Sequence, residues 1–232
     1  MLENAHKNNV RQIICIGTSR EDSLAAAEFA AAHDNVYWTY GIHPEYADKI
    51  TESRGLPSPS KPIAIGEVGL DYHYTGYDRE AQIRLFEQML QLAVDNDLPV
   101  SFHVREASDD FFPVVENFPN VRGVVHSFTD SKKTLKRILA ETDFYVGVNG
   151  LATYSTLPTP PLERILLETD APFLTPVPFR GIINEPAYVK AVAGWLSKHL
   201  GLEYQLIERE TTNNAKQLFG LQNTVFRQAR GV

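Results

Sequence analysis

Short apolar runs rich in β-branched residues alternate along this chain with segments of helical period, and this alternation constrains the fold most. Strands that alternate with helices form βα units, which pair as a parallel sheet covered by helices. The sequence therefore predicts an α/β protein. Seven runs qualify as strands: Gln12–Thr18, Val36–His43, Ile63–Asp71, Val100–Arg105, Gly123–Phe128, Phe144–Val148 and Arg164–Thr169.

Helix start and stop signals lie between these runs. Ser19 begins a capping box for a helix through Ala32, and Asp78 precedes a long amphipathic helix. Glycines end the last two predicted helices. We expect further helices at Ser131–Ala140, Glu185–Leu200 and Glu203–Phe219. Two connections are poor in helix: the proline-rich Leu56–Pro62 leaves only Glu45–Arg54 for a helix after the second strand, and the prolines of Leu151–Glu163 leave little room for a regular helix.

The charge balance narrows the function. The chain has 22 Lys and Arg against 29 Asp and Glu, a net charge of −7. Proteins that hold polyanions by bulk electrostatics are usually basic, so a nucleic-acid coat and a membrane-surface binder are disfavoured. An enzyme that binds one phosphate through a metal ion and a few arginines remains compatible with this charge.

Length and cysteine usage set the expected context. A chain of 232 residues fits a single domain, residues 1–232. No apolar stretch approaches the roughly 20 residues that span a bilayer, and the first residues contain no signal-type apolar segment. The one cysteine, Cys15, lies in an apolar run and reads as a small hydrophobe rather than a nucleophile. We expect a cytoplasmic protein with no membrane contact and no obligate protein partner.

Several of the predicted strands end in polar residues that could carry chemistry. Glu67, His103, His126 and Asp170 stand at the ends of four different strands. The carboxyl ends of the strands of a βα-barrel meet at one face, so these side chains are expected to converge. Imidazole nitrogens and carboxylate oxygens together are ligands for a divalent metal. Taken singly, each residue is equally a hydrogen-bonded loop or core residue.

Several motifs resemble the TatD-type metal-dependent hydrolases, and they cover nearly the whole chain in the family's order. The most specific pair is Gly66-Glu67-Val68-Gly69-Leu70-Asp71 with Glu168-Thr169-Asp170-Ala171-Pro172. The others are Gly41-Ile42-His43-Pro44, His103-Val104-Arg105-Glu106-Ala107, Val125-His126-Ser127-Phe128, Pro178-Phe179-Arg180-Gly181 with Asn184-Glu185-Pro186, and Thr211-Thr212-Asn213-Asn214-Ala215.

The resemblance implies a TIM-like (β/α) barrel that hydrolyses DNA phosphodiesters with one or two divalent metal ions. By position, Glu67 matches a carboxylate that bridges the metals, and His103 and His126 match imidazole ligands. Asp170 matches a carboxylate that contacts metal and takes the proton of the attacking water. The catalytic residues are then Asp170 and Glu67, and the ligands are Glu67, His103, His126 and Asp170. The sequence does not distinguish Mg²⁺, Mn²⁺ and Zn²⁺.

One departure from the family concerns its first strand, which normally ends in His-x-His. This sequence contains seven strand candidates where a closed barrel needs eight, and His6 has no second histidine two residues away. We expect the first strand to be missing from the barrel. Two explanations are open: the working protein begins further upstream and is a complete enzyme, which we favour, or the chain is a shortened, impaired homologue.

Four further residues are candidates for substrate binding. The guanidinium forks of Arg105 and Arg180 match phosphate oxygens, although either arginine serves equally in a structural ion pair. His43 follows the second strand and either lines the pocket or is a hydrogen-bonded turn residue. Asn184 lies in the loop that also carries Arg180.

Three hypotheses of function follow. The leading one is a metal-dependent phosphodiesterase, specifically a DNA exonuclease that uses metal-activated water, with DNA as substrate. The second is an amidohydrolase-type enzyme acting on a small ester, amide or lactone through the same metal site. The third is a truncated, catalytically impaired metal-binding homologue, in which replacing Glu67 changes metal content but no turnover.

Overall fold

The computed structural model describes residues 1–50, 55–57 and 61–221, and these contain one seven-stranded parallel sheet. The strands are paired in chain order, β1 to β7, and each lies within its predicted range. The predicted α/β class and all seven strands are therefore confirmed. The strands are β1 (Ile13–Cys15), β2 (Val36–Tyr40), β3 (Ala64–Asp71), β4 (Val100–Arg105), β5 (Gly123–Val125), β6 (Tyr145–Val148) and β7 (Ile165–Leu167).

Helices fill the connections largely as predicted. Ser19, Asp78 and Ser131 each accept a backbone N–H in the first turn of a helix, as N-cap residues do. Gly201 and Gly220 take the left-handed conformation at two helix ends. The helices are α1 (Leu2–Lys7), α2 (Arg20–Ala31), α3 (Arg79–Asp95), α4 (Ser108–Glu116), α5 (Lys132–Glu141), α6 (Val189–Leu200) and α7 (Tyr204–Phe219).

In their described residues, the connections expected to be poor in helix contain 3₁₀ turns and no α-helix. Residues 51–54 of the predicted Glu45–Arg54 helix lie outside the described residues, and the described part is a 3₁₀ helix. The helix expected from Glu185 begins as a 3₁₀ turn and becomes α-helical only at Val189. Helix α4 was not anticipated. The 3₁₀ helices are η1 (Pro44–Lys49), η2 (Gly150–Thr153), η3 (Leu162–Arg164) and η4 (Pro186–Tyr188).

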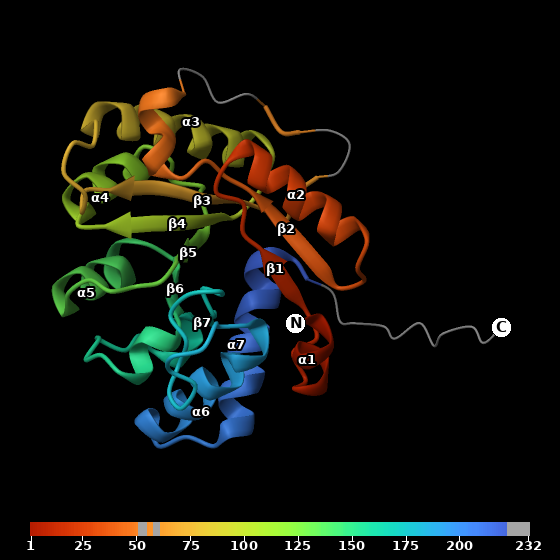
Figure 1. Ribbon diagram of the computed structural model, residues 1–232. Helices are drawn as coiled ribbons and strands as arrows, with labels where there is room; N and C mark the ends of the chain where they lie inside the picture. Colours follow the sequence, from red (N-terminus) through yellow and green to blue (C-terminus); the bar gives the residue numbers. More distant parts are fainter. Residues whose placement is uncertain (51–54, 58–60, 222–232) are drawn as a thin grey trace.

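The sheet curls into part of a barrel with helices on its outer side (Figure 1). Helices α2 and α3 lie against the β1–β3 side, whereas α6 and α7 lie beside β7. Strands β1 and β7 are the two ends of this arrangement, and no pairing joins them within the described residues. The curl is that of a TIM-like barrel built here from seven strands. No helix in the described part of the chain has the length and apolar character needed to cross a bilayer.

Apolar side chains beneath the sheet form one large core and two smaller ones. The large core joins β2 to β6 with α3 and α4 and contains Phe86, Phe102 and Phe111, all at most 1% exposed. A separate core joins the end of β6 and β7 to α6 and α7, with Leu196 and Ile207 fully buried. These cores fix the strands, so the residues at the carboxyl ends of the strands are held by rigid elements.

Candidate metal centre

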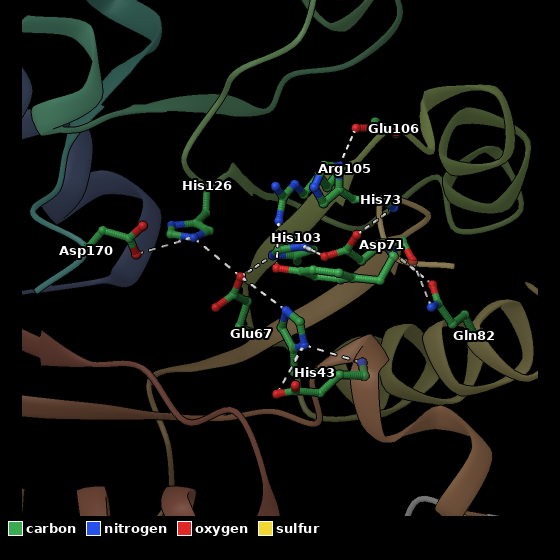
Figure 2. A network of polar contacts seen from close by, with 12 residues as sticks. His43, Glu67, Asp71, His73, Gln82, His103, Arg105, Glu106, His126 and Asp170 are labelled. Atoms are coloured by element: carbon green, nitrogen blue, oxygen red, sulfur yellow. Dashed lines mark hydrogen bonds and ion pairs between the residues drawn. The ribbon is translucent and has the colours of Figure 1, made fainter. Parts of the chain in front are cut away.

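The four ligands predicted from the sequence gather at the carboxyl edge of the sheet (Figure 2). Glu67 belongs to β3 and His103 to β4, while His126 and Asp170 follow β5 and β7. Parallel strands place their carboxyl ends at the same edge, which is why residues up to 103 positions apart in sequence meet. Figure 2 shows Glu67 at the centre, with His43, His103 and His126 directed toward it.

A β-bulge aims the Glu67 side chain at this centre. Ile65 pairs with Val100 and Val68 with Phe102, so two residues of β3 oppose one residue of β4. Such a bulge reorients side chains without ending the strand. The β2 neighbour is Gly41, where a Cβ atom would lie 2.2 and 2.3 Å from backbone atoms of Gly66 and Glu67. Glycine at position 41 therefore permits the close approach that seats Glu67.

Glu67 contacts both predicted histidine ligands. Its Oε1 atom lies 2.5 Å from His103 Nδ1 and 3.4 Å from His126 Nε2. The three residues offer one ligand atom each within 4.8 Å of one another. All three side chains are less than one fifth exposed. The geometry is therefore that of a compact group able to hold one metal ion.

Burial and the neighbouring charges shift the pKa values of these residues in opposite directions. Burial disfavours the charged form of Glu67, but the imidazolium of His126 and a hydrogen bond from His103 outweigh it and lower the Glu67 pKa to about 2. Burial likewise disfavours charge on His126, but Glu168 and Glu67 outweigh it and raise its pKa to about 10. In the same way the pKa of His103 is raised despite burial. Without metal, the His126 ring is therefore protonated at neutral pH, and its positive charge partly offsets the carboxylates.

Asp170 stands at the side of the centre formed by β7. Its Oδ1 atom lies 3.7 Å from His126 Nε2, and its side chain is 30% exposed. Burial raises the pKa of the Asp170 carboxyl, and although His126 opposes this, Glu168 and Glu67 add to it. A carboxylate whose pKa is raised holds a proton more readily than an ordinary aspartate.

Two carboxylates that the sequence interpretation left without a role also belong to the centre. Asp71 Oδ2 lies 3.0 Å from His103 Nε2, and Glu168 Oε2 lies 3.3 Å from His126 Nδ1. Both occur within the motifs quoted above. The sequence feature that could have identified them is their spacing from the predicted ligands: Asp71 follows Glu67 by four residues, and Glu168 precedes Asp170 by two.

His43 lies against the centre without touching a carboxylate as closely as the other two histidines. Its ring is 4.4 Å from the His103 ring, and its Nε2 atom is 4.0 Å from Glu67 Oε1. Its Nδ1 atom accepts a hydrogen bond from the Glu45 N–H. Burial and His103 lower the pKa of His43. His43, Asp71 and His103 form a second group with metal-ligating atoms within 4.8 Å, and it shares His103 with the first.

The two arginines predicted to bind substrate occupy different places. Arg105 follows His103 by two residues on β4, on the same face of the strand, and its guanidinium lies 5.4 Å from the Tyr74 ring. Arg180 packs its guanidinium 3.9 Å from the Tyr154 ring and donates to the Thr175 carbonyl. For both residues, contact with substrate stays a prediction.

Asn184 is 2% exposed and bonds backbone groups of its own loop. Its Nδ2 atom donates to the carbonyls of Thr169 and Phe173, and its Oδ1 atom accepts from the Glu185 N–H. These bonds fix the loop directly after Asp170. They occupy the side-chain amide, so the structure gives Asn184 a loop-holding role, and its predicted contact with substrate is left without support.

The donor set fits a divalent metal ion. Four carboxylates, those of Glu67, Asp71, Glu168 and Asp170, surround the imidazoles of His103 and His126. Such a concentration of buried negative charge is costly unless cations compensate it. Imidazole nitrogen with carboxylate oxygen is a ligand set that first-row divalent ions accept. The residues present therefore fit a divalent metal ion.

Comparison with known proteins agrees with this geometry. The family model described as TatD related DNase matches residues 1–220 of the chain. The chain belongs to the TatD family. Similar proteins include YabD, an uncharacterized metal-dependent hydrolase of Bacillus subtilis, which is 34% identical over 94% of this chain and 91% of the YabD chain. Another is the 3′–5′ ssDNA/RNA exonuclease TatD of Pantoea ananatis, 32% identical over 95% of this chain and 92% of its own.

Solved TatD structures share the fold. The crystal structure of the TatD homologue YjjV from Escherichia coli K12 superposes with a TM-score of 0.81 at 26% identity, covering 95% of this chain and 91% of that one. A TatD family hydrolase from Entamoeba histolytica gives a TM-score of 0.82 at 22% identity, over 94% and 87%. The predicted family, the TIM-like fold and the metal dependence are thereby confirmed, and the chain is a TatD-family metal-dependent hydrolase.

Proposed function

We propose that the chain cleaves phosphodiester bonds of nucleic acid, and that its preferred substrate is single-stranded DNA degraded from an end. The observation that carries the proposal is the Glu67, His103 and His126 group beside Asp170 in a TatD-family chain. A relative named as a 3′–5′ ssDNA/RNA exonuclease aligns over 95% of the chain and supports the substrate class.

Glu67, His103, His126 and Asp170 would hold the metal. A divalent ion bound there lowers the pKa of a water molecule and offsets the negative charge of a phosphodiester. Asp170, at 30% exposed, is the most exposed of these four side chains, so the phosphate is expected to approach from its side of the centre.

Asp170 acts as the general base. Its carboxylate accepts the proton of the water that attacks phosphorus in line with the leaving oxygen. Burial and neighbouring carboxylates raise the pKa of Asp170, so its carboxyl can hold that proton and then give it to the leaving oxygen, which regenerates the carboxylate. Arg105 lies on the face of β4 that carries His103 and supplies a guanidinium fork for phosphate oxygens.

The test is cleavage of a fluorescently labelled single-stranded oligonucleotide in Mn²⁺ or Mg²⁺, with EDTA as the metal-free control. We expect stepwise, metal-dependent shortening, with the polarity read from substrates labelled at either end. Glu67→Gln should abolish it. Glu80→Gln, which replaces a carboxylate 82% exposed on α3, should cleave like wild type.

Two outcomes would redirect the proposal. A folded, metal-loaded chain that leaves every oligonucleotide intact but hydrolyses an ester, amide or lactone from a substrate panel is an amidohydrolase-type enzyme. A chain that turns over neither class, and whose metal content but not activity responds to Glu67→Gln, is a metal-binding homologue without catalysis.

A further inference from the structure

Each histidine at the metal centre has both ring nitrogens engaged, one by Glu67 and one by a second carboxylate. His103 directs Nδ1 to Glu67 at 2.5 Å and Nε2 to Asp71 at 3.0 Å. His126 is reversed, with Nε2 3.4 Å from Glu67 and Nδ1 3.3 Å from Glu168. The two outer carboxylates therefore lie on the sides of the rings that face away from Glu67.

A neutral imidazole carries a proton on one nitrogen and a lone pair on the other. An ionised carboxylate only accepts hydrogen bonds, so it holds the proton on the nitrogen that faces it. The opposite nitrogen is then left bare for a metal, and the contact orients the ring and makes that nitrogen more basic.

We propose that Asp71 and Glu168 are positioning residues that hold the two histidines in opposite tautomers for metal binding. Asp71 keeps the proton of His103 on Nε2 and leaves Nδ1 to the metal. Glu168 keeps the proton of His126 on Nδ1 and leaves Nε2 to the metal. The inference rests on the metal site of the proposed function but not on its substrate.

Asp71 is built to stay in one position. Its side chain is 7% exposed, and its Oδ1 atom accepts the His73 N–H at 2.9 Å. The Gln82 side chain, 3% exposed on α3, accepts the Asp71 N–H at 2.8 Å and donates to the Asp71 carbonyl at 2.9 Å. The carboxylate that orients His103 is thus fixed through both its side chain and its backbone.

Glu168 is fixed in a different way. Its Oε1 atom accepts the Ser127 N–H at 2.5 Å, next in sequence to the histidine that it orients. Its carboxylate lies over Gly147 of β6, where a Cβ atom would be 2.4 Å from Oε1 and 2.6 Å from Cδ. Glycine at this position leaves the space that lets Glu168 reach His126.

The first measurement uses the wild-type chain loaded with Zn²⁺, which is diamagnetic, after labelling its histidines with ¹⁵N. Long-range ¹H–¹⁵N spectra distinguish the two tautomers of each ring. We expect His103 protonated on Nε2 and His126 protonated on Nδ1. The same tautomer for both rings would overturn the inference, and this result requires no variant to fold.

The second measurement is Zn²⁺ affinity by calorimetry without nucleic acid. Asp71→Asn and Glu168→Gln keep the side-chain shape but remove the charge, and each should weaken Zn²⁺ binding by about 10- to 100-fold. Gly147→Ala displaces Glu168 without changing its chemistry, so it should weaken binding and alter the spectrum of His126 alone. Unfolding curves confirm that each variant is folded.

Glu106→Gln is the matched control. Glu106 also pairs with a histidine, since its Oε1 atom lies 2.6 Å from His73 Nδ1, but this pair is exposed at the rim. Zn²⁺ affinity should be unchanged. Folded Asp71 and Glu168 variants that bind Zn²⁺ within twofold of wild type would overturn the inference. A wild-type chain that binds Zn²⁺ but does not cleave the oligonucleotide would instead count against the proposed function alone.

Discussion

The two sides of the curled sheet are supported very differently. The β2 to β5 side rests on the large core, in which Phe86, Phe102 and Phe111 pack ring against ring. The β7 side rests on the smaller core that includes Leu196 and Ile207. Larger apolar cores contribute more to stability, in proportion to the area removed from water.

The metal centre spans this boundary. Glu67 and His103 extend from strands over the large core, whereas Glu168 and Asp170 lie in the loop directly after β7. Candidate ligands therefore come from both sides: Glu67, His103 and His126 from the side with the large core, and Asp170, the expected proton acceptor, from the side with the smaller core. Asp170→Asn and cavity variants of the two cores test how the two sides differ.

The largest expected effect is that of Asp170→Asn. Loss of the general base should lower kcat by about 10²- to 10⁴-fold. Zn²⁺ affinity should fall much less, because Glu67, His103 and His126 still form a complete ligand group. Oligonucleotide kinetics at saturating Mn²⁺ and Zn²⁺ calorimetry separate the two quantities. Equal losses in both would show that Asp170 serves chiefly as a ligand.

Cavities in the two cores should have unequal consequences. Phe86→Ala should lower the free energy of unfolding by about 3–5 kcal/mol and Leu196→Ala by about 2–5 kcal/mol. The chain has two tryptophans, Trp38 in the large core and Trp195 against the smaller one. Urea unfolding, followed in single-tryptophan variants, therefore monitors each core separately.

We expect Leu196→Ala to move the Trp195 transition to lower urea ahead of the Trp38 transition. Phe86→Ala should move both together, because β7 pairs with β6 and depends on the sheet beneath it. Trp38→Phe and Trp195→Phe in the otherwise wild-type chain are the controls. Coincident transitions in both cavity variants would mean that the two cores unfold as one unit.

Metal affinity should rise with pH. The His126 pKa is raised to about 10, so a metal must displace at least the His126 proton at neutral pH, and the raised pKa of His103 acts in the same direction. Glu67, with a pKa of about 2, stays ionised throughout. Below pH 10, the Kd for Zn²⁺ should fall at least about tenfold per pH unit, one factor of ten for each proton released.

Calorimetry at pH 6, 7 and 8, in buffers of different ionisation enthalpy, counts those protons. A Kd independent of pH over this range would contradict the charge state assigned to the metal-free centre.

The smallest effect concerns Cys15 on the end strand β1. Burial, aided by the charge of Asp22, raises the pKa of its thiol, so less thiolate is present at pH 8 than for a free cysteine. Reaction with a disulfide reagent should be several-fold slower than in the urea-unfolded chain and should accelerate as pH rises. Asp22→Asn should reduce this difference in rate between the folded and the unfolded chain. Equal rates in folded and unfolded chains would show that β1 is not held in place.

The sequence was sufficient for the strands, most helices and the convergence of the four candidate ligands. Alternation of apolar runs with capped helical segments reports on local structure, and Ser19, Asp78 and Ser131 cap helices as their positions indicated. Helix α4 was missed because Pro113 lies inside it, and proline usually argues against a helix interior. The ligands were recognisable because each follows a strand within a specific motif.

What the sequence by itself determined, then, was the parallel α/β fold and the convergence of Glu67, His103, His126 and Asp170 at one edge. The tertiary structure decided the use of each ring nitrogen, the roles of Asp71 and Glu168, and the engagement of Asn184 by its own loop. The physical reason is range: strand patterns are local, whereas a tautomer depends on atoms that approach within about 3 Å only after distant strands have paired.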